Sequence, residues 1–273
     1  MSVYDENNYY EGNNAGSRLS RIFDSGIAFM DWLTSVYMRK FIKSSTGKVA
    51  DIGAGVGRLL YYFKKHGYEV YGTSISKTAC RVSKERYDIV INYNDDIPEE
   101  WPEKKFEAVS YWHVFEHLEN PERHLESVSR ILKPGGLLFI EVPNPESIGA
   151  NLNRDAWLGS DPVFHINMLS YNEVEKLLYK YGFNIIHKNN FSAKFSFLFI
   201  WSGLIGFINP KDCNFNFIFD LFKRPAASIK NKPILVIICY ISLIILSPVV
   251  LFMLCYGLLR NRGEIIRLIA HKL

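Results

Sequence analysis

Two kinds of hydrophobic pattern alternate along the first 190 residues of the chain. Short unbroken apolar runs are typical of strands in a parallel sheet, and apolar residues that recur every three or four positions are typical of helices. The runs predict strands at residues 48–52, 69–73, 88–92, 106–112, 137–142 and 183–187, with a last strand at 264–271. The periodic segments predict helices at residues 17–42, 56–66, 77–86, 122–132 and 171–181. This alternation predicts an α/β fold with a doubly wound, mostly parallel seven-stranded sheet.

Polar residues and glycines mark the ends of several predicted helices. Ser76 and Ser170 directly precede two of them, where a hydroxyl can accept a hydrogen bond from the first turn. Gly182 follows the helix at 171–181, and Lys133-Pro134-Gly135-Gly136 follows the helix at 122–132 as a stop and turn signal.

The composition changes from Phe195 onward. Residues 195–208 are strongly apolar, and residues 234–259 form a run of 26 residues without a charge. That run exceeds the ~20 residues of a membrane-spanning helix. However, Pro248 divides it into arms of 14 and 11 residues, and each arm is shorter than ~30 Å of hydrocarbon. The pattern therefore favours a re-entrant or interface-lying hairpin over a span.

Two alternatives for this run stay open. Pro248 can merely kink a spanning helix, with residues 195–208 as the second crossing. The run can also be a buried dimerisation hairpin. Basic residues precede and follow the run, and this favours a cytoplasmic position for both flanks. The basic residues are Lys211, Lys223, Arg224, Lys230, Lys232, Arg260 and Arg262.

Charge and cysteine content exclude some functions and compartments. The net charge of +4 is too small to indicate a nucleic-acid-binding protein. The four cysteines have no zinc-site spacing and suggest a reducing compartment. The N-terminus has no basic region followed by an apolar run, so we expect no signal peptide.

A glycine-rich turn follows the first predicted strand, in the segment Val49-Ala50-Asp51-Ile52-Gly53-Ala54-Gly55-Val56-Gly57. Gly53 and Gly55 would let the backbone turn tightly and approach a ligand without a Cβ in the way. Asp51 at the strand end could hold an ammonium group. An ordinary strand-to-helix turn is the simpler alternative.

Other motifs share the order and spacing of one family. They are Tyr71-Gly72-Thr73-Ser74-Ile75-Ser76, Trp112-His113-Val114-Phe115-Glu116-His117-Leu118, Ile131-Leu132-Lys133-Pro134-Gly135-Gly136-Leu137-Leu138 and Tyr181-Gly182-Phe183. Together with the glycine turn, they resemble class I S-adenosylmethionine-dependent methyltransferases, in particular the bacterial branch similar to ubiquinone-biosynthesis O-methyltransferases. The resemblance implies the seven-stranded methyltransferase sheet and S-adenosyl-L-methionine as cofactor.

The resemblance also implies roles for individual residues. Gly53, Gly55 and Gly57 would line the methionine part of the cofactor, with Asp51 near its amino group. Asp95 or Asp96 would lie near the adenine, and Trp112 would pass close to the sulfonium. The Lys-Pro-Gly-Gly turn carries no chemistry in this interpretation.

One position departs from the family pattern. The second strand of the family normally ends in Asp or Glu, which accepts hydrogen bonds from both ribose hydroxyls, whereas Ser74 stands here. Loss of the charged, bidentate hydrogen bonds would weaken the binding free energy of the cofactor by roughly 1.5–3 kcal/mol. A compensating group can restore this affinity, or the domain is a cofactor-binding protein with impaired catalysis.

Two histidines are the candidates for a general base. His165 lies in the segment 157–170, the acceptor-side loop of the family branch, in which Trp157 is also kept and Phe164 replaces the usual arginine. His113 shares one face of a helical turn with Glu116 and His117, an arrangement that suits a base or a weak metal site. For His117, packing with a bond to a backbone carbonyl is the simpler alternative. We expect no resident metal.

These observations predict three regions. Residues 1–45 would form an N-terminal helical cap, residues 46–191 plus 263–273 the S-adenosylmethionine-binding domain, and residues 192–262 an apolar, membrane-associating helical insertion. We expect methyl transfer to a hydroxyl of a small-molecule or lipid-linked acceptor, a glycan or a quinol-like ring, at the cytoplasmic face of the cell membrane. The alternative is a catalytically impaired cofactor-binding or scaffolding protein at the membrane.

Overall fold

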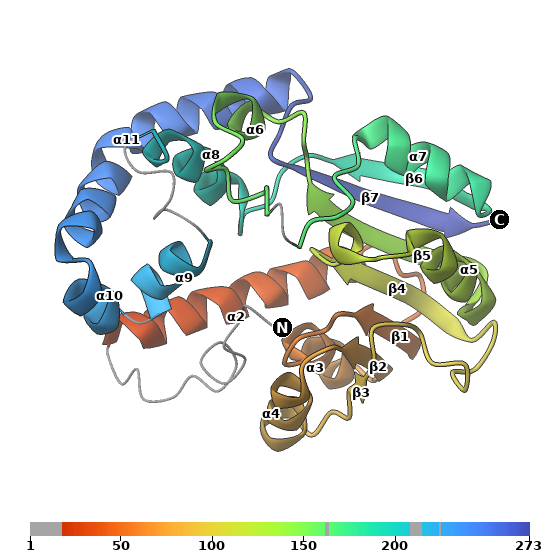
Figure 1. Ribbon diagram of the computed structural model, residues 1–273. Helices are drawn as coiled ribbons and strands as arrows, with labels where there is room; N and C mark the ends of the chain where they lie inside the picture. The colour runs from red at the N-terminus through yellow and green to blue at the C-terminus, as the bar shows by residue number, and fades with distance from the viewer. Residues whose placement is uncertain (1–17, 162–163, 208–214, 224) are drawn as a thin grey trace.

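The computed structural model describes residues 18–161, 164–207, 215–223 and 225–273. The start of the predicted N-terminal cap, up to residue 17, lies outside the described residues. Within these ranges one sheet with helices on both faces forms the larger part of the molecule, and a group of helices extends from one end of it (Figure 1).

The sheet contains seven strands in the order β3-β2-β1-β4-β5-β7-β6. Six strands run in the same direction, and β7, which lies between β5 and β6, is antiparallel to both of its neighbours. This topology confirms the predicted fold class. The strands are β1 (Gly47–Ile52), β2 (Tyr68–Ser74), β3 (Asn92–Tyr93), β4 (Phe106–Trp112), β5 (Leu132–Pro143), β6 (Phe183–Asn189) and β7 (Ile265–Lys272).

Helices cover both faces of the sheet because alternate strand residues point to opposite faces. Val49 and Phe139 face α2 (Arg18–Arg39) and α3 (Arg58–Lys65), whereas Ala50 and Ile140 face α5 (Pro121–Ile131) and α7 (Tyr171–Lys180). The remaining helical elements of the domain are α4 (Lys77–Tyr87), the short 3₁₀ helix η1 (Phe115–His117) and α6 (Ile148–Leu152).

The predicted helix boundaries are confirmed where caps were named. The Ser76 hydroxyl accepts a hydrogen bond from the Ala79 N–H at the start of α4. Ser170 and Glu173 form a capping box at the start of α7, and Gly182 follows this helix with a φ of +78°.

The Lys133-Pro134-Gly135-Gly136 segment is not a turn outside the sheet, as the sequence predicted, but an irregular part of β5. The pairing of β4 with β5 shifts register between Phe106 and Ala108, so the extra residues bulge out of the ladder. Gly135 takes a φ of +72° there, which explains the glycine.

The insertion between β6 and β7 is helical. It contains α8 (Ser196–Ile205), α9 (Phe215–Lys223), α10 (Pro225–Asn231) and α11 (Pro233–Leu259). In Figure 1 these helices and the N-terminal half of α2 surround the space beyond the sheet edge, with α11 on the outside.

The predicted division of the long apolar run at Pro248 is wrong, because α11 is one continuous helix of 27 residues. Proline removes the N–H that would bond to the Ile244 carbonyl, four residues earlier. The Ser247 hydroxyl donates to that same carbonyl at 2.9 Å, which replaces the lost hydrogen bond. No hairpin forms within this run, which is about 40 Å long at 1.5 Å per residue.

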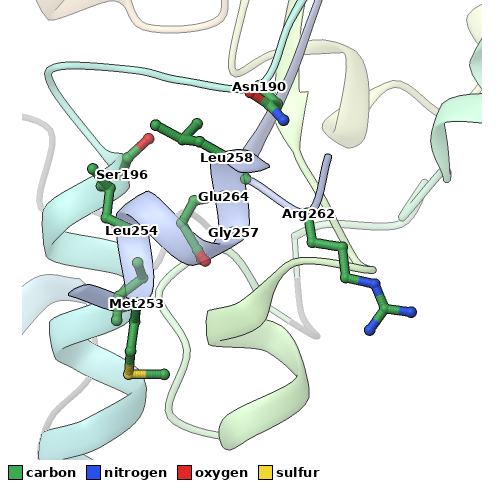
Figure 2. A pocket seen from close by; sticks show the side chains of 10 residues that line it. Asn190, Ser196, Met253, Leu254, Gly257, Leu258, Arg262 and Glu264 are labelled. Carbon is green, nitrogen blue, oxygen red and sulfur yellow. The ribbon is translucent and has the colours of Figure 1, made fainter. Parts of the chain in front are cut away.

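A buried carboxylate joins the insertion to the sheet domain where α11 ends and β7 begins. Figure 2 shows Glu264 at this junction beside the last turn of α11, with the Arg262 side chain extending away. Glu264 is 1% exposed and accepts hydrogen bonds from the Gly149 N–H (2.9 Å), the Trp157 Nε1–H (2.8 Å) and the Ser147 hydroxyl (3.2 Å). Burial raises the pKa of Glu264 to about 7, and the three donors only partly offset it.

The raised pKa of Glu264 predicts a pH-dependent stability. A carboxyl that binds its proton more tightly in the folded state stabilises that state fully below its unfolded pKa of 4.5, and this contribution is lost as the pH rises through about 7. Between pH 5 and pH 8 the free energy of unfolding of the wild type should fall by about 2 kcal/mol more than that of Glu264→Gln. Urea unfolding followed by tryptophan fluorescence measures the difference.

The matched control for this experiment is Glu146→Gln, since Glu146 is an exposed carboxylate just before the same helix α6. Its pH profile should overlay that of the wild type. Parallel profiles for the wild type and Glu264→Gln would contradict the assignment.

Candidate active site

The glycine turn after β1 borders a cleft of about 1950 Å³ at the carboxyl ends of the parallel strands. Gly53, Gly55 and Gly57 all have positive φ values, of +69°, +53° and +75°. A Cβ on Gly53 would lie 2.4 Å from Cγ2 of Val114. Gly53 and Gly55 line the cleft, whereas a Cβ on Gly57 would meet Ser83 beneath the turn. Gly57 therefore does not face the cleft, and its missing Cβ lets the start of α3 approach Ser83 of α4 closely.

Asp51, at the end of β1, presents a buried carboxylate to this cleft. Among the described residues its side chain receives one hydrogen bond, from the Ser110 hydroxyl at 2.7 Å. Burial raises the pKa of Asp51 to about 7, against the lowering effect of that hydrogen bond. An ammonium group placed beside Asp51 would favour its ionised form, so the position suits a cationic ligand atom.

The residues predicted near the ribose and adenine lie along the adjoining part of the cleft. Ser74 ends β2 and is buried, and its hydroxyl accepts a hydrogen bond from the Ser76 N–H. Asp96 is paired with Arg123 at 2.7 Å and accepts a bond from the Ile97 N–H, whereas Asp95 is exposed. Asp95 is thus the more available carboxylate for an added ligand.

His113 belongs to a group of charged side chains that line the cleft. Its Nε2 lies 3.0 Å from Oε1 of Glu141, and Glu141 also pairs with Arg267. Burial alone would lower the pKa of His113, but the Glu116 and Glu141 carboxylates raise it to about 9. The pKa of Glu141 is held at about 2 by Arg267 and His113, in spite of its burial. His113 is therefore protonated at neutral pH and poorly suited to take a proton.

His165 has the opposite character. Its Nδ1 lies 2.9 Å from the Gly159 carbonyl oxygen, and the Asp161 N–H approaches the same nitrogen at a longer 3.3 Å. We assign the proton to Nδ1 from the shorter contact, which leaves Nε2 with a free lone pair. Burial lowers the pKa of His165, with partial compensation by the Glu116 carboxylate. This side chain lines the cleft as a neutral imidazole.

His117 lies beside His165 rather than with His113, with the two ring centres 4.6 Å apart. Its Nδ1 is 3.0 Å from the Phe164 carbonyl oxygen, which is the backbone contact that the simpler alternative predicted. The predicted packing of this side chain is wrong, because His117 is exposed. Glu116 is 1% exposed, and its Oε1 is paired with the His113 Nδ1 at 3.4 Å, too long for a good hydrogen bond. One oxygen of Glu116 and one ring nitrogen each of His117 and His165, atoms of the kind that bind metal ions, all lie within 4.8 Å of one another.

The structure changes the role of one predicted residue, Trp157, and adds two residues to the site that the sequence analysis did not name. Trp157 is 1% exposed and donates to Glu264, so it supports the loop more than it contacts an acceptor. Asp31 and Lys194 were not predicted. Asp31, on α2, pairs with Arg58 (3.0 Å) and with Lys194 (3.3 Å), which precedes α8, and all three line the cleft. Of these residues only Arg58 could have been found from the sequence, because it directly follows the glycine turn.

The site has features that fit S-adenosylmethionine. The glycine turn leaves bare backbone at the cleft, and Asp51 is a buried carboxylate with no salt bridge among the described residues, although Lys194 is near enough to lower its pKa. Trp112 lines the same cleft, and its buried indole N–H has no hydrogen-bond partner among the described residues. A zwitterionic amino acid with an attached nucleoside matches such a donor and acceptor set.

Comparison with known proteins agrees with this fit. Residues 28–188 match the family model described as "Methyltransferase domain". The chain belongs to this family, and its cofactor is S-adenosyl-L-methionine.

The curated relatives are distant and longer than the match. An uncharacterized protein of Methanocaldococcus jannaschii is 28% identical over 141 residues, which are 51% of this chain and 66% of that protein. The ubiquinone biosynthesis O-methyltransferase of Coxiella burnetii is 30% identical over 113 residues, 40% of this chain and 48% of that enzyme. The matches thus span less than two thirds of either relative.

A solved structure shows the same fold over nearly the whole chain. The putative sarcosine dimethylglycine methyltransferase from Galdieria sulphuraria superposes with a TM-score of 0.59 at 13% identity. The match covers 98% of this chain and 97% of that protein.

Proposed function

We propose that the protein transfers a methyl group from S-adenosylmethionine to a hydroxyl of a membrane-held or lipid-linked acceptor, a glycan or a quinol-like ring. The observation that carries the proposal is the continuous cleft, which joins the glycine turn and Asp51 to a neutral, oriented His165. The similarity to ubiquinone biosynthesis O-methyltransferases supports oxygen as the methylated atom.

When bound, the cofactor supplies an electrophilic methyl group on a positively charged sulfur. Gly53 and Gly55 would lie against its amino-acid part, Asp51 would pair with its ammonium group, and Ser74 and Asp95 would lie near the nucleoside. His165 would accept the proton of the acceptor hydroxyl at Nε2, while the Gly159 carbonyl keeps the ring oriented through Nδ1. Much of the remaining catalysis would come from holding the two reactants in line.

The outer face of α11 supports a position on a membrane surface. By length and composition α11 could cross a membrane, and 22% of its most apolar window is buried. Large apolar side chains form an exposed stripe along it, namely Ile234, Ile237, Ile241, Ile244, Ile245, Val249, Phe252 and Leu259. Exposed apolar surface of this extent is typical of an interaction site.

Two features favour a helix lying in the interface over a spanning one. The inner face of α11 packs against α8, and its buried residues Val236, Cys239 and Val250 belong to the same hydrophobic cluster as those of α8. β7 begins within a few residues of the end of α11. If α11 crossed the membrane, it would be pulled away from α8 and from the start of β7. The neighbouring Lys and Arg residues suit anionic headgroups. These features support the proposal that the protein lies at the cytoplasmic face of the cell membrane, with α11 in the headgroup layer.

This position predicts a loss of membrane binding when charges enter the stripe. The double change Ile237→Glu and Ile244→Glu alters residues that are 57% and 77% exposed. Partition onto vesicles of phosphatidylcholine and phosphatidylglycerol should fall about tenfold or more, because two inserted side chains are replaced by carboxylates. Vesicle sedimentation measures the partition.

The control for this change uses exposed apolar residues elsewhere. Val90 and Ile186 are 69% and 47% exposed and lie outside the insertion. Val90→Glu with Ile186→Glu should leave partition unchanged. Equal losses in both double variants would contradict the interfacial position of α11.

The proposed function is tested by comparing lipid extracts of membranes from cells with and without the gene. Mass spectrometry should find a component that is heavier by one CH₂ group only when the gene is present. A second candidate, a cofactor-binding or scaffolding protein without turnover, is favoured by Ser74 in place of a carboxylate. Extracts without such a difference, from a protein that still binds S-adenosylhomocysteine, would support that candidate.

A further inference from the structure

The cleft is larger than the cofactor and a compact acceptor require. Pockets for small molecules and cofactors measure about 300–1000 Å³, whereas this cleft encloses about 1950 Å³. The cleft extends toward the helical insertion, because residues of α2, α8 and α9 contribute to the lining together with the strand ends.

The two parts of the cleft differ in chemistry. The part at the strand ends is lined by the acidic, histidine and serine side chains described above. The part between α2, α8 and α9, here called the side chamber, is lined mostly by apolar side chains, although α2 also contributes Asp24, Ser25, Asp31 and Thr34 to the cleft lining. The side chamber is defined by Ile27 and Met30 of α2, Leu198 and Phe199 of α8, and Ile218 and Phe222 of α9.

Aromatic contacts connect the side chamber to the reacting end and close its far end. The His113 ring lies 4.2 Å from the Phe195 ring and 6.1 Å from the Phe199 ring, centre to centre. At the other side, Phe23 of α2 stacks on Phe222 of α9 with ring centres 5.7 Å apart. The side chamber is therefore continuous with the active site, and contacts between elements far apart in sequence define its walls.

The side chamber also lies next to the proposed membrane-facing surface. α8 separates the two, since Leu198 and Phe199 line the cleft while Trp201 donates a hydrogen bond to Ser242 of α11. Figure 1 shows α8 inside the curve of α11, toward the space bounded by α9 and α2. A chain leaving a bilayer at α11 would need to pass only this layer of helices.

We propose that the side chamber holds the hydrocarbon chain of the acceptor, so that the substrate class is a lipid whose chain enters the protein while its headgroup reaches His165. A mostly apolar chamber in contact with water is unfavourable, and a saturated or isoprenoid chain would remove its walls from water. A purely polar sugar or a short-chain quinol would leave it unfilled. This inference rests on the proposed function and adds the position of the acceptor's chain.

The test uses the full-length protein on vesicles of phosphatidylcholine and phosphatidylglycerol that contain a long-chain alcohol with a diazirine near the chain end. S-adenosylhomocysteine is present to fill the cofactor end, and adducts formed on irradiation are mapped by tandem mass spectrometry. We expect adducts at Met30 and Ile218 as well as on α11. Leu198→Trp, which fills the chamber, should lower the adducts on α9 about tenfold, since displacing two methylene groups already changes affinity by about that factor.

Leu251→Trp is the matched control, because Leu251 is 52% exposed on the outer face of α11. It should leave the adducts on α9 unchanged, and Leu198→Trp should leave those on α11 unchanged. Adducts confined to α11 in the wild type, or equally abundant adducts on α9 in Leu198→Trp, would overturn the inference.

Calorimetry with S-adenosylhomocysteine separates this inference from the proposed function. Cofactor binding without adducts in the side chamber would remove the inference alone, whereas absence of cofactor binding in the wild type would remove the proposed function. Retained binding also shows that Leu198→Trp is folded. If that variant does not fold, Ile27→Trp, from the opposite wall, gives the same reading.

Discussion

Gly55→Val should weaken the binding of S-adenosylhomocysteine by about 100-fold or more, or about 2.7 kcal/mol. Gly55 lines the cleft with a φ of +53°, where bare backbone would contact the ligand. The valine adds three carbons at that surface and also disfavours the backbone conformation by about 1–2 kcal/mol. Isothermal titration calorimetry measures the affinity.

The backbone strain needs a control of its own. Gly135 has a similar φ of +72°, and a Cβ built on it meets nothing within 4 Å. Gly135→Val should therefore lose a similar amount of stability and keep its affinity for S-adenosylhomocysteine. If Gly55→Val binds as tightly as Gly135→Val, the glycine turn is not the cofactor site.

His165→Ala should lower methyl transfer by about 100-fold or more, the usual contribution of a positioned base, without change in cofactor affinity. Transfer is measured with deuterated S-adenosylmethionine and membranes from cells that lack the gene. The wild-type rate should rise with pH and level off near neutrality, because only the unprotonated imidazole accepts a proton and burial lowers the pKa of His165. The variant should lose this pH dependence.

Two further histidine variants complete this experiment. His66→Ala, at an exposed position after α3, should retain the wild-type rate. His113→Ala would break the contacts with Glu116 and Glu141 and should lower stability. Retained activity in His165→Ala together with loss in a folded His113→Ala would transfer the role of base to His113.

The sheet could be predicted from sequence because its signals are local. Each buried strand is a short apolar run, and residues such as Ser76 and Ser170 cap helices through bonds within one turn. The bulge at Gly135 escaped prediction because the pairing of β5 with β4 decides whether a Pro-Gly-Gly segment leaves the sheet. The continuity of α11 escaped for a related reason, since a single hydroxyl, that of Ser247, replaces the bond that Pro248 removes.

The same contrast between local signals and contacts made only in the folded chain applies to the site. Asp51 and the glycines are adjacent in sequence, so the resemblance locates them directly. The pKa of His113 is raised first by Glu116, three residues further along the chain, and then by Glu141 from the next strand. The charge of Glu141 is in turn stabilised by Arg267, from a strand more than a hundred residues away. Lys194 and Asp31 also meet only in the folded chain. The sequence contains these residues but has no pattern that joins them.

The most direct test of the central claim is transfer of a labelled methyl group by the purified full-length protein. The protein is incubated with deuterated S-adenosylmethionine and membranes from cells that lack the gene, and the organic extract is analysed by mass spectrometry. The account predicts a deuteromethyl group on an oxygen of a lipid-extractable compound, absent with Gly55→Val. Label found only in water-soluble compounds, or in none while S-adenosylhomocysteine still binds, would contradict it.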